Sequence, residues 1–484
     1  MAAKEQNMCH NYMLLKPQEA SWFDLVRLLA SSRMEKRKFI ESPEERDDDL
    51  QELRKFQRRW LIFISLLVQK LLIAVHNPLG QIGYMLEMWL NFLSINDGLL
   101  GIFFNLLKGK LVWPDRLTET FRSVTGISDT RVELDKSITH DDTRYRVSLS
   151  MMAAKLSYEN EAFVGTTVRN HWNMDLLGFF NFWNDYQDLP STQAIMVQDT
   201  RTQPNLIIVA FRGTEPFDGD AWRTDIDISW FEIENVGKIH GGFMKALGLQ
   251  KNKGWPKEID RGNGDQNRQY AYYEIRQKLR DVLEKNENAK FILTGHSLGG
   301  ALAVLFTALL AYHEEELLLE RLEGVYTFGQ PRVGDIKFGD FMNDKLKKYT
   351  VRYIRHVYSN DIVPRIPSDD KSLLFKHFGL CHHFNSLYHG KVVWEEPNKN
   401  YFSLLWIIPK YLNAVWELIR SFIIPYILGK NYKEGWLMKF FRLVGLVIPG
   451  IPAHLPQDYV NATRLGSFHR AVRLLNQDTE SKED

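Results

Sequence analysis

The residues most suited to chemistry are Gly295-His296-Ser297-Leu298-Gly299, a G-x-S-x-G pattern between a short apolar strand and an apolar helix. A serine on a tight strand-to-helix turn is held outward in a strained conformation, and flanking glycines remove the clashes that side chains would cause. Free N–H groups at the start of the following helix favour developing negative charge. The pattern therefore predicts Ser297 as an acyl-transfer nucleophile rather than part of an ordinary glycine-rich turn.

A serine nucleophile requires an acid that orients its histidine base, and the expected chain order is Ser, Asp, His. Asp361 follows a predicted strand at Val351–Tyr358 directly, at the end of the strand where ligand sites gather in open α/β sheets. Asp335 is the alternative, but its preceding strand comes one step too early in the chain. We therefore predict Asp361 as the acid.

The base must follow Asp361 in the chain. His454 lies in a proline-rich loop before the last helix, and such a loop can bring an imidazole back over the sheet edge. His469 lies in a helical pattern, where a histidine is more often a surface or packing residue. We predict His454 as the base and keep His469 as the alternative. The six candidates are His377, His382, His383, His389, His454 and His469.

The cluster Cys381-His382-His383, with two further histidines nearby, raises the alternative of a metal site. Adjacent residues of a strand point to opposite sides, and no second group of ligands supports such a site. We expect structural histidines here, no metal and no cofactor.

An oxyanion formed at Ser297 needs donors on the opposite side. The N–H of Leu298 is one, and the second is expected after another central strand, where Gly213 lets the backbone approach closely and Thr214 offers an N–H and a hydroxyl. The next stretch, residues 215–222, has the composition of a mobile lid.

Strands and helices alternate between residues 192 and 358, which predicts an α/β fold with a mainly parallel sheet. Strands are expected at Thr192–Asp199, Leu206–Phe211, Phe291–Thr294, Gly324–Phe328 and Val351–Tyr358, and helices at Tyr270–Glu287 and Leu298–His313.

Two apolar regions flank this core. Residues 1–59 are polar, whereas residues 60–113 predict two apolar helices separated by a break at Asn77-Pro78-Leu79-Gly80. Such a hairpin, with basic residues before it, is typical of a segment that dips into lipid or lies on its surface. A hairpin buried inside a soluble domain is the alternative.

The second apolar region, residues 400–450, lies within the expected catalytic domain at 114–476. Its mixture of aromatic residues, prolines and cations indicates helices at a lipid interface, or alternatively a subdomain that caps a pocket. The tail at 477–484 is polar, and we expect it to be disordered.

Composition excludes several classes. The 484 residues include 61 Lys and Arg against 60 Asp and Glu, so no strong field attracts nucleic acid. The two cysteines, Cys9 and Cys381, rule out a disulfide framework. No apolar run follows a basic start in the first thirty residues, so we expect no secretory signal and a location facing the cytosol.

Together these motifs resemble the class 3 (fungal-type) lipases. The resemblance rests on Phe211-Arg212-Gly213-Thr214, His240-Gly241-Gly242-Phe243, Gly295–Gly300, Phe328–Gly334 and Asn360–Pro364. With its two apolar regions, the chain is similar to the plant oil-body lipases of that family.

The resemblance implies an α/β-hydrolase fold and hydrolysis of triacylglycerol without a cofactor, through Ser297, Asp361 and His454, with Thr214 and Leu298 as the oxyanion hole. It also implies a location on lipid droplets and on the endoplasmic-reticulum membrane. Phospholipid or galactolipid hydrolysis, and a non-catalytic droplet scaffold, are the alternatives.

Overall fold

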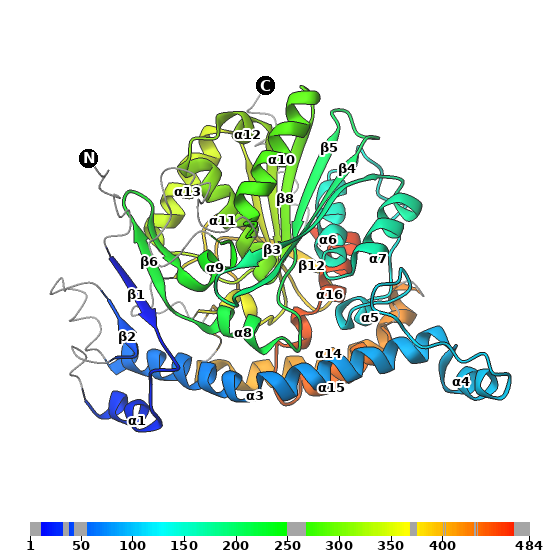
Figure 1. Ribbon diagram of the computed structural model, residues 1–484, viewed down its shortest axis with the longest axis horizontal. Helices are drawn as coiled ribbons and strands as arrows, with labels where there is room; N and C mark the ends of the chain where they lie inside the picture. Colours follow the sequence, from blue (N-terminus) through cyan, green and yellow to red (C-terminus); the bar gives the residue numbers. More distant parts are fainter. Residues whose placement is uncertain are drawn as a thin grey trace.

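A nine-stranded sheet forms the centre of the molecule (Figure 1). The computed structural model describes residues 11–31, 38–42, 56–248, 268–367, 375–399, 401, 403–429, 432 and 434–468. The strand order is β13-β12-β11-β10-β9-β8-β5-β4-β3. These strands are β3 (Asp175–Asn184), β4 (Leu189–Asp199), β5 (Leu206–Phe211), β8 (Lys290–His296), β9 (Leu322–Phe328), β10 (Arg352–Tyr358), β11 (Leu380–Phe384), β12 (His389–Val393) and β13 (Ser467–Phe468).

The middle of the sheet is parallel. Strands β5, β8, β9, β10 and β11 pair in parallel, and β3 and β4 extend the sheet as antiparallel neighbours. Every residue of β5 is buried, as expected for a strand covered on both faces. Because parallel strands end at the same edge, the segments after β5, β8 and β10 are brought together. This arrangement confirms the expected α/β-hydrolase fold.

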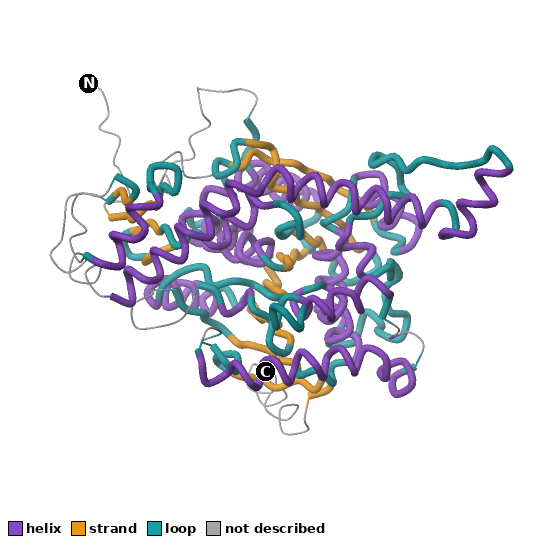
Figure 2. The backbone as a smooth tube through the Cα atoms, turned by 90° about the horizontal axis from the view of Figure 1, so that it is seen from below, coloured by secondary structure: helices purple, strands orange, loops and turns teal. Residues whose placement is uncertain are grey.

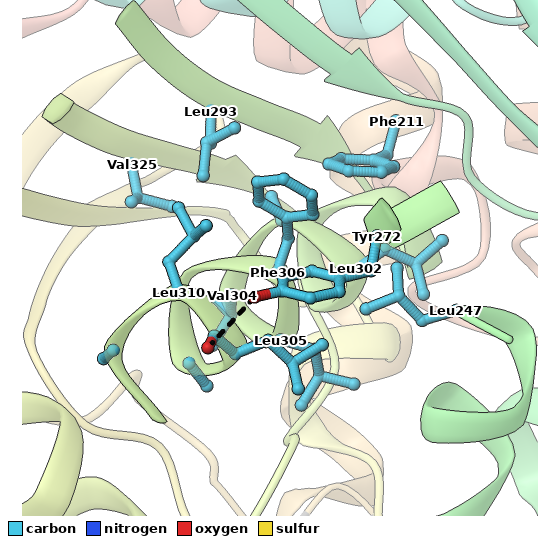
Figure 3. Close-up of a cluster of buried hydrophobic side chains, with 14 of the residues drawn as sticks. Phe211, Leu247, Tyr272, Leu293, Leu302, Val304, Leu305, Phe306, Leu310 and Val325 are labelled. Atoms are coloured by element: carbon cyan, nitrogen blue, oxygen red, sulfur yellow. Dashed lines mark hydrogen bonds between the residues drawn. The ribbon is translucent and has the colours of Figure 1, made fainter. Parts of the chain in front are cut away.

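Helices cover both faces of the sheet. One face packs against α9 (Gly241–Ala246), α10 (Ala271–Lys285), α11 (Leu298–Tyr312), α12 (Glu316–Arg321) and α13 (Ile336–Lys348). The other packs against α6 (Tyr145–Leu156), α7 (Glu161–Thr166) and α16 (Pro456–Leu465). Figure 3 shows the first core, in which Phe306 of α11 lies between Phe211 of β5 and Tyr272 of α10. The first core fixes α11, and with it the residue that precedes it.

A second, antiparallel sheet of four strands stands beside the main one, and the sequence patterns did not predict it. Its order is β2-β1-β6-β7, formed by β1 (Asn11–Leu15), β2 (Ile40–Glu41), β6 (Trp230–Ile233) and β7 (Gly237–His240). Helix α1 (Trp22–Ala30) follows β1, and a capping box at Ser21 and Asp24 fixes its start. The N-terminal region is thereby attached to the catalytic domain.

The first apolar region differs from its prediction. Helix α3 (Phe56–Ile95) is continuous, so the expected break at Pro78 is wrong. A proline inside a helix removes one backbone hydrogen bond, and packing against the domain on both sides of Pro78 keeps the helix together. A turn at Asp97 leads instead to α4 (Gly98–Leu107), none of whose residues is buried. In Figure 1, α3 crosses the lower side of the molecule and α4 projects beyond it.

The second apolar region lies on the same side as α3 (Figure 1), and Figure 2 looks onto that side. It consists of α14 (Ile407–Leu428) and α15 (Trp436–Val444), preceded by a short turn at Leu404–Trp406. The sequence left open whether this region lies at a lipid interface or caps a pocket, and three of its cations, Lys410, Arg420 and Arg442, are buried. Arg420 and Arg442 pair with three buried carboxylates, which offsets the loss of their hydration.

Three more short helices occur in the described part of the chain: α5 (Val124–Ser128), α8 (Gly219–Ile226) and a single turn of π-helix at Thr167–His171. Short 3₁₀ turns occur at Val363–Arg365 and Pro452–His454. The helix α8 lies between the main sheet and α3 in Figure 1. The expected tail at 477–484 lies outside the described residues.

Candidate active site

Ser297 lies on the turn between β8 and α11, as its motif predicts. Its backbone has φ 57° and ψ −133°, a strained conformation for a residue with a side chain, and its N–H donates to the Phe328 carbonyl at 2.9 Å. A Cβ built on Gly299 would lie 2.1 Å from the Phe211 oxygen, so only glycine permits this approach of α11 to β5. The turn that carries the serine side chain is therefore held by contacts with β9, through Phe328, and with β5, through Phe211.

Asp361 and His454 lie 93 positions apart in sequence, and the structure brings them into contact. The His454 Nδ1 is 2.8 Å from the Asp361 Oδ2. The other oxygen of Asp361 accepts the Val363 N–H at 2.9 Å, and the whole residue is buried. Because a carboxylate accepts only, it selects the histidine tautomer that carries its proton on Nδ1.

Tyr459 is a third partner of this acid. Its hydroxyl donates to the Asp361 Oδ2 at 2.5 Å, and it accepts the Tyr358 N–H at 3.3 Å. Burial and the Asp361 charge raise the pKa of Tyr459 well above its ordinary value, so it stays a donor. Tyr459 thus fixes the carboxylate oxygen that also faces His454.

His296, the residue before the serine, holds the loop that carries His454. Its Nε2 is 2.7 Å from the His454 carbonyl and its Nδ1 is 2.9 Å from the Tyr158 hydroxyl. Burial holds the pKa of His296 well below its usual range, so the ring is neutral. We assign the proton to Nε2, because a carbonyl can only accept, and Tyr158 then donates to Nδ1.

The Nε2 of His454 faces no hydrogen-bond partner among the described residues, although it is buried. The ring of His454 lies beside that of His296, with the centroids 4.6 Å apart. This buried basic nitrogen has no partner and lies on a ring beside His296, the residue before a serine on a strained turn, so it is available to accept a proton. The arrangement has the elements of a serine-dependent acyl-transfer site.

Thr214 and Leu298 lie beside this serine. Thr214 follows β5, and a Cβ on its neighbour Gly213 would be 3.0 Å from the Ser297 Cβ, which shows how closely this loop approaches. Leu298 is the first residue of α11, where backbone N–H groups lack a partner inside the helix. The Thr214 hydroxyl donates to the Asp225 Oδ2 of α8 at 2.8 Å.

Asp225 is a buried carboxyl whose second oxygen lacks a partner among the described residues. Burial raises the pKa of Asp225 to about 7, and the hydrogen bond from Thr214 and the nearby His454 offset part of this effect. The end of α8 is therefore connected to Thr214, which directly follows Gly213, the residue that approaches Ser297.

The remaining candidates lie elsewhere. Asp335 caps α13 by accepting the Phe338 N–H. The side chains of His377 and His383 contact the carbonyls of Pro364 and Ser359. Burial lowers the pKa of His382 to about 4. His469 lies outside the described residues.

Within the described ranges, no three His, Cys, Asp or Glu side chains are grouped so as to hold a metal ion. His382 and His383 alternate along β11, as adjacent strand residues do, so this chain segment offers no ligand set.

Sequence patterns did not identify Tyr459, Asp225 or the anchoring role of His296. Tyr459 lies five residues after His454, on the first turns of α16, so a search for polar side chains near the predicted base would have found it. Asp225 is one of several acidic residues between 215 and 227. Asp227 is buried as well, so the contact with Thr214 is what distinguishes Asp225.

Several known proteins are similar to this chain. A profile of the family described as Lipase (class 3) matches residues 208–371. Triacylglycerol lipase OBL1 of Nicotiana tabacum is 42% identical over 84% of this chain and 83% of its own length. OBL1 of Arabidopsis thaliana is 40% identical over 94% and 95%. The structure of Rhizomucor miehei triacylglyceride lipase is 24% identical, with a TM-score of 0.38, over 51% of this chain and 81% of that one.

Proposed function

Because the chain belongs to the class 3 lipases and is a serine ester hydrolase, we propose that it hydrolyses triacylglycerol at the surface of lipid droplets. Ser297 is the nucleophile, Asp361 the acid and His454 the base, with Thr214 and Leu298 as oxyanion donors. The observation that carries this assignment is the buried, unpartnered Nε2 of His454, whose Nδ1 is held by Asp361.

The reaction follows from these positions. The His454 Nε2 takes the proton of the Ser297 hydroxyl while the serine oxygen attacks the ester carbonyl, and the oxyanion is stabilised by Leu298 and Thr214. The imidazolium then protonates the departing glyceride alcohol, which leaves an acyl-enzyme. A water molecule, deprotonated by His454, attacks the acyl-enzyme and releases the fatty acid, and Ser297 recovers its proton.

Triacylglycerol is supported as substrate by two independent features. The two OBL1 relatives are named for this activity and match most of the chain. In addition, many large apolar side chains are exposed on α3, α4, α14 and α15, all on one side of the molecule. Exposed apolar area of this extent, concentrated on one side, marks an interaction surface, and a bulk apolar phase is its simplest partner.

The same surface supports the location. Helix α3 contains the one described segment that is long and apolar enough to cross a membrane, residues 58–95. However, its 40 residues extend about 60 Å at 1.5 Å per residue, twice a bilayer core, and one side of it packs against the domain. A helix of this kind lies along a lipid surface. We place that surface on droplets and on the endoplasmic-reticulum membrane, facing the cytosol.

Fatty-acid release from emulsified long-chain triacylglycerol tests the proposal, with wild type beside Ser297→Ala. Release by the wild type alone supports the assignment, because alanine removes only the attacking oxygen. A serine-reactive fluorophosphonate probe serves as the control for an active site. Equal turnover by both proteins would overturn the role of Ser297.

If neither protein releases fatty acid while the wild type still reacts with the probe, triacylglycerol is the wrong substrate. Phospholipid and galactolipid would then be tested with the same pair. A wild type that reacts with neither the probe nor a lipid would be a scaffold without activity.

A further inference from the structure

The proposed catalytic residues are covered in this structure. Ser297 is 2% exposed, Asp361 is fully buried, and the Nε2 of His454 is out of reach of solvent. An ester in a lipid phase therefore cannot reach the serine until some element moves. The question is which element covers the site, and what holds it in place.

The element next to these residues is the segment 215–226, which we call the lid segment; it comprises a loop and helix α8. It begins directly after Thr214, and its far end returns to Thr214 through Asp225. Helix α8 packs on its inner side against α9, where a Cβ on Gly242 would lie 2.6 Å from the Thr224 oxygen. Its outer side is covered by α3, as Figure 1 shows.

Helix α3 contacts the lid segment along its whole length. At one end, the Ser65 hydroxyl donates to the Ile226 carbonyl at 2.9 Å. In the middle, a Cβ on Gly219 would be 3.3 Å from the Cβ of His76. At the other end, a Cβ on Gly83 would be 2.4 Å from the Phe217 Cβ, so glycine alone allows this packing. Thus α3 crosses the lid segment from its last residue back to its loop.

Phe217 is also held from a second side. It packs with Leu86 and Leu90 of α3 and with Leu437 and Phe441 of α15 in one small hydrophobic cluster. The loop of the lid segment is therefore clamped between the two apolar regions of the chain.

The part of α3 over the lid segment is the part that is least attached. No residue between 70 and 82 is buried, whereas buried residues lie on both sides of this stretch. Pro78 removes a backbone hydrogen bond within it. A cavity of about 280 Å³ lies beside these contacts, between α3 and the loop, and is lined among others by His76, Glu87 and Asp218. This stretch can bend without breaking a packed core.

Its outward side is apolar. Leu71, Val75 and Ile82 are each exposed by more than 40%. In water, bending of this stretch leaves these side chains in contact with water. At a lipid surface, bending is favoured because it transfers their apolar area from water into lipid.

We propose that α3 is a strap, which holds the lid segment over the active site and releases it when the outward side of residues 70–82 enters a lipid surface. The strap thereby couples attachment to lipid with access to Ser297. This inference rests on the proposed function for the identity of the surface, but the coupling itself is a property of the chain.

A reversible cross-link tests the strap. His76→Cys with Gly219→Cys, in a Cys9→Ser background, places two Cβ atoms 3.3 Å apart, a few tenths of an ångström below the usual range of about 3.5–4.5 Å. We expect the oxidised protein to float with a triolein emulsion yet release fatty acid about tenfold or more slowly, with recovery on reduction. Thiol counting confirms that the bond has formed.

The matched control is Asn11→Cys with Glu232→Cys, which joins facing positions of β1 and β6 away from the lid segment. This cross-link should leave hydrolysis unchanged. If the oxidised strap variant hydrolyses bound emulsion at the rate of its reduced form, the strap is refuted.

A second variant acts in the opposite direction. Phe217→Ala removes the side chain that α3 and α15 hold, so the fluorophosphonate probe should react with Ser297 several-fold faster in the absence of lipid. An unchanged reaction rate would contradict the strap.

Probe labelling also separates this inference from the substrate. Labelling that lipid accelerates, and that the oxidised cross-link prevents, supports the strap even if triolein is not hydrolysed. Labelling that lipid does not accelerate refutes it, whatever the substrate.

Discussion

The two apolar regions of this molecule expose similar surfaces but are attached to the catalytic domain in different ways. Helices α14 and α15, which we call the platform, are fixed through buried charges. The strap α3 is fixed through packing and hydrogen bonds at its two ends, with an unburied stretch between them. Both regions face the same side (Figures 1 and 2).

The platform is joined to α16 by an ion cluster. Arg420 lies 3.1 Å from Asp458 and 2.8 Å from Glu417, and Arg442 lies 2.7 Å from Asp458 and 2.9 Å from Glu434. All five side chains are exposed by 6% or less.

Asp458 immediately precedes Tyr459 and lies four residues after His454. The Tyr358 hydroxyl, at the end of β10, also donates to Glu417 at 3.0 Å. The platform therefore holds the chain segments that carry the proposed base and acid.

Beyond Arg58 and Arg59, which are buried at its start, the strap is attached among the described residues by one ion pair, hydrogen bonds and apolar packing. Its Glu87 pairs with Arg116, whose side chain is half exposed, and Asn91 exchanges hydrogen bonds with the Arg122 backbone. Separating a buried ion pair leaves an unpaired charge inside the protein, which costs several kcal/mol. Neutral contacts and partly exposed ion pairs can be broken and re-formed at a smaller cost. The platform therefore fixes the proposed catalytic residues, whereas the strap has the weaker attachment that the proposed release requires.

The largest effect on activity is expected for a residue in the part of the domain that the platform holds. Asp361→Asn should lower kcat by about 10⁴, because an amide facing His454 allows the imidazole tautomer whose Nε2 cannot accept a proton. Fatty-acid release and probe labelling measure this loss. Asp335→Asn, which alters only the cap of α13, is the control and should keep full turnover. A loss of less than tenfold in Asp361→Asn would remove Asp361 from the triad.

The next effect compares the two attachments directly. Asp458→Asn leaves two buried guanidinium groups short of one negative charge and should reduce the free energy of unfolding by about 3–5 kcal/mol. Glu87→Gln on the strap should cost no more than about 1 kcal/mol, because its partner is exposed to water. Urea unfolding monitored by tryptophan fluorescence measures both. Similar losses of unfolding free energy in the two variants would contradict the proposed difference between the attachments of the platform and the strap.

A third effect concerns the lid segment, which lies between the strap and the catalytic residues. Burial raises the pKa of Asp225 to about 7 from an ordinary 3.8. Between about pH 4 and pH 7, the unfolded chain has released this proton while the folded chain retains it, so stability falls as pH rises and levels off above about pH 7.

Asp225→Asn removes this titration. The variant should gain stability relative to the wild type across that window, by on the order of a few kcal/mol near pH 7. Thermal unfolding between pH 4 and pH 8 measures the difference. Parallel curves for the two proteins would show that Asp225 is already ionised in the folded state.

The smallest effect separates binding from release. Val75→Ser with Ile82→Ser on the strap, and Ile408→Ser with Leu412→Ser on the platform, each remove two exposed apolar side chains and should weaken emulsion binding by about tenfold. Only the strap pair should also lower the hydrolysis rate per bound molecule. Flotation combined with fatty-acid release gives that rate, and equal rates for both pairs would mean that the strap serves attachment alone.

Local sequence patterns predicted a large part of the fold. The strand Leu206–Phe211 has the predicted bounds, and the strand before Ser297 and the helix after it lie where their apolar runs placed them. Such elements are predictable because a buried strand or helix needs a continuous apolar run, and a strand-to-helix turn needs small residues at fixed spacing.

Long-range contacts account for the errors. Pro78 and Gly80 looked like a break, but packing on both sides of them holds α3 in one piece. One of the two interpretations placed Arg420 and Arg442 at a lipid interface, but packing against α16 buries them beside Glu417, Glu434 and Asp458. A window of neighbouring residues does not show either outcome. It contains Glu417, three residues before Arg420, but not the packing that buries this pair or holds α3 together.

By itself, the sequence determined the α/β class, the strained serine turn and the choice of Asp361 and His454 as its candidate partners, since each depends on residue type, spacing or chain order. The tertiary structure alone decided that Tyr459 and His296 hold these partners, that the platform is fixed by buried charge, and that α3 lies across the lid segment. These features arise from contacts between segments distant in the chain, whose free energy depends on burial and geometry rather than on local pattern.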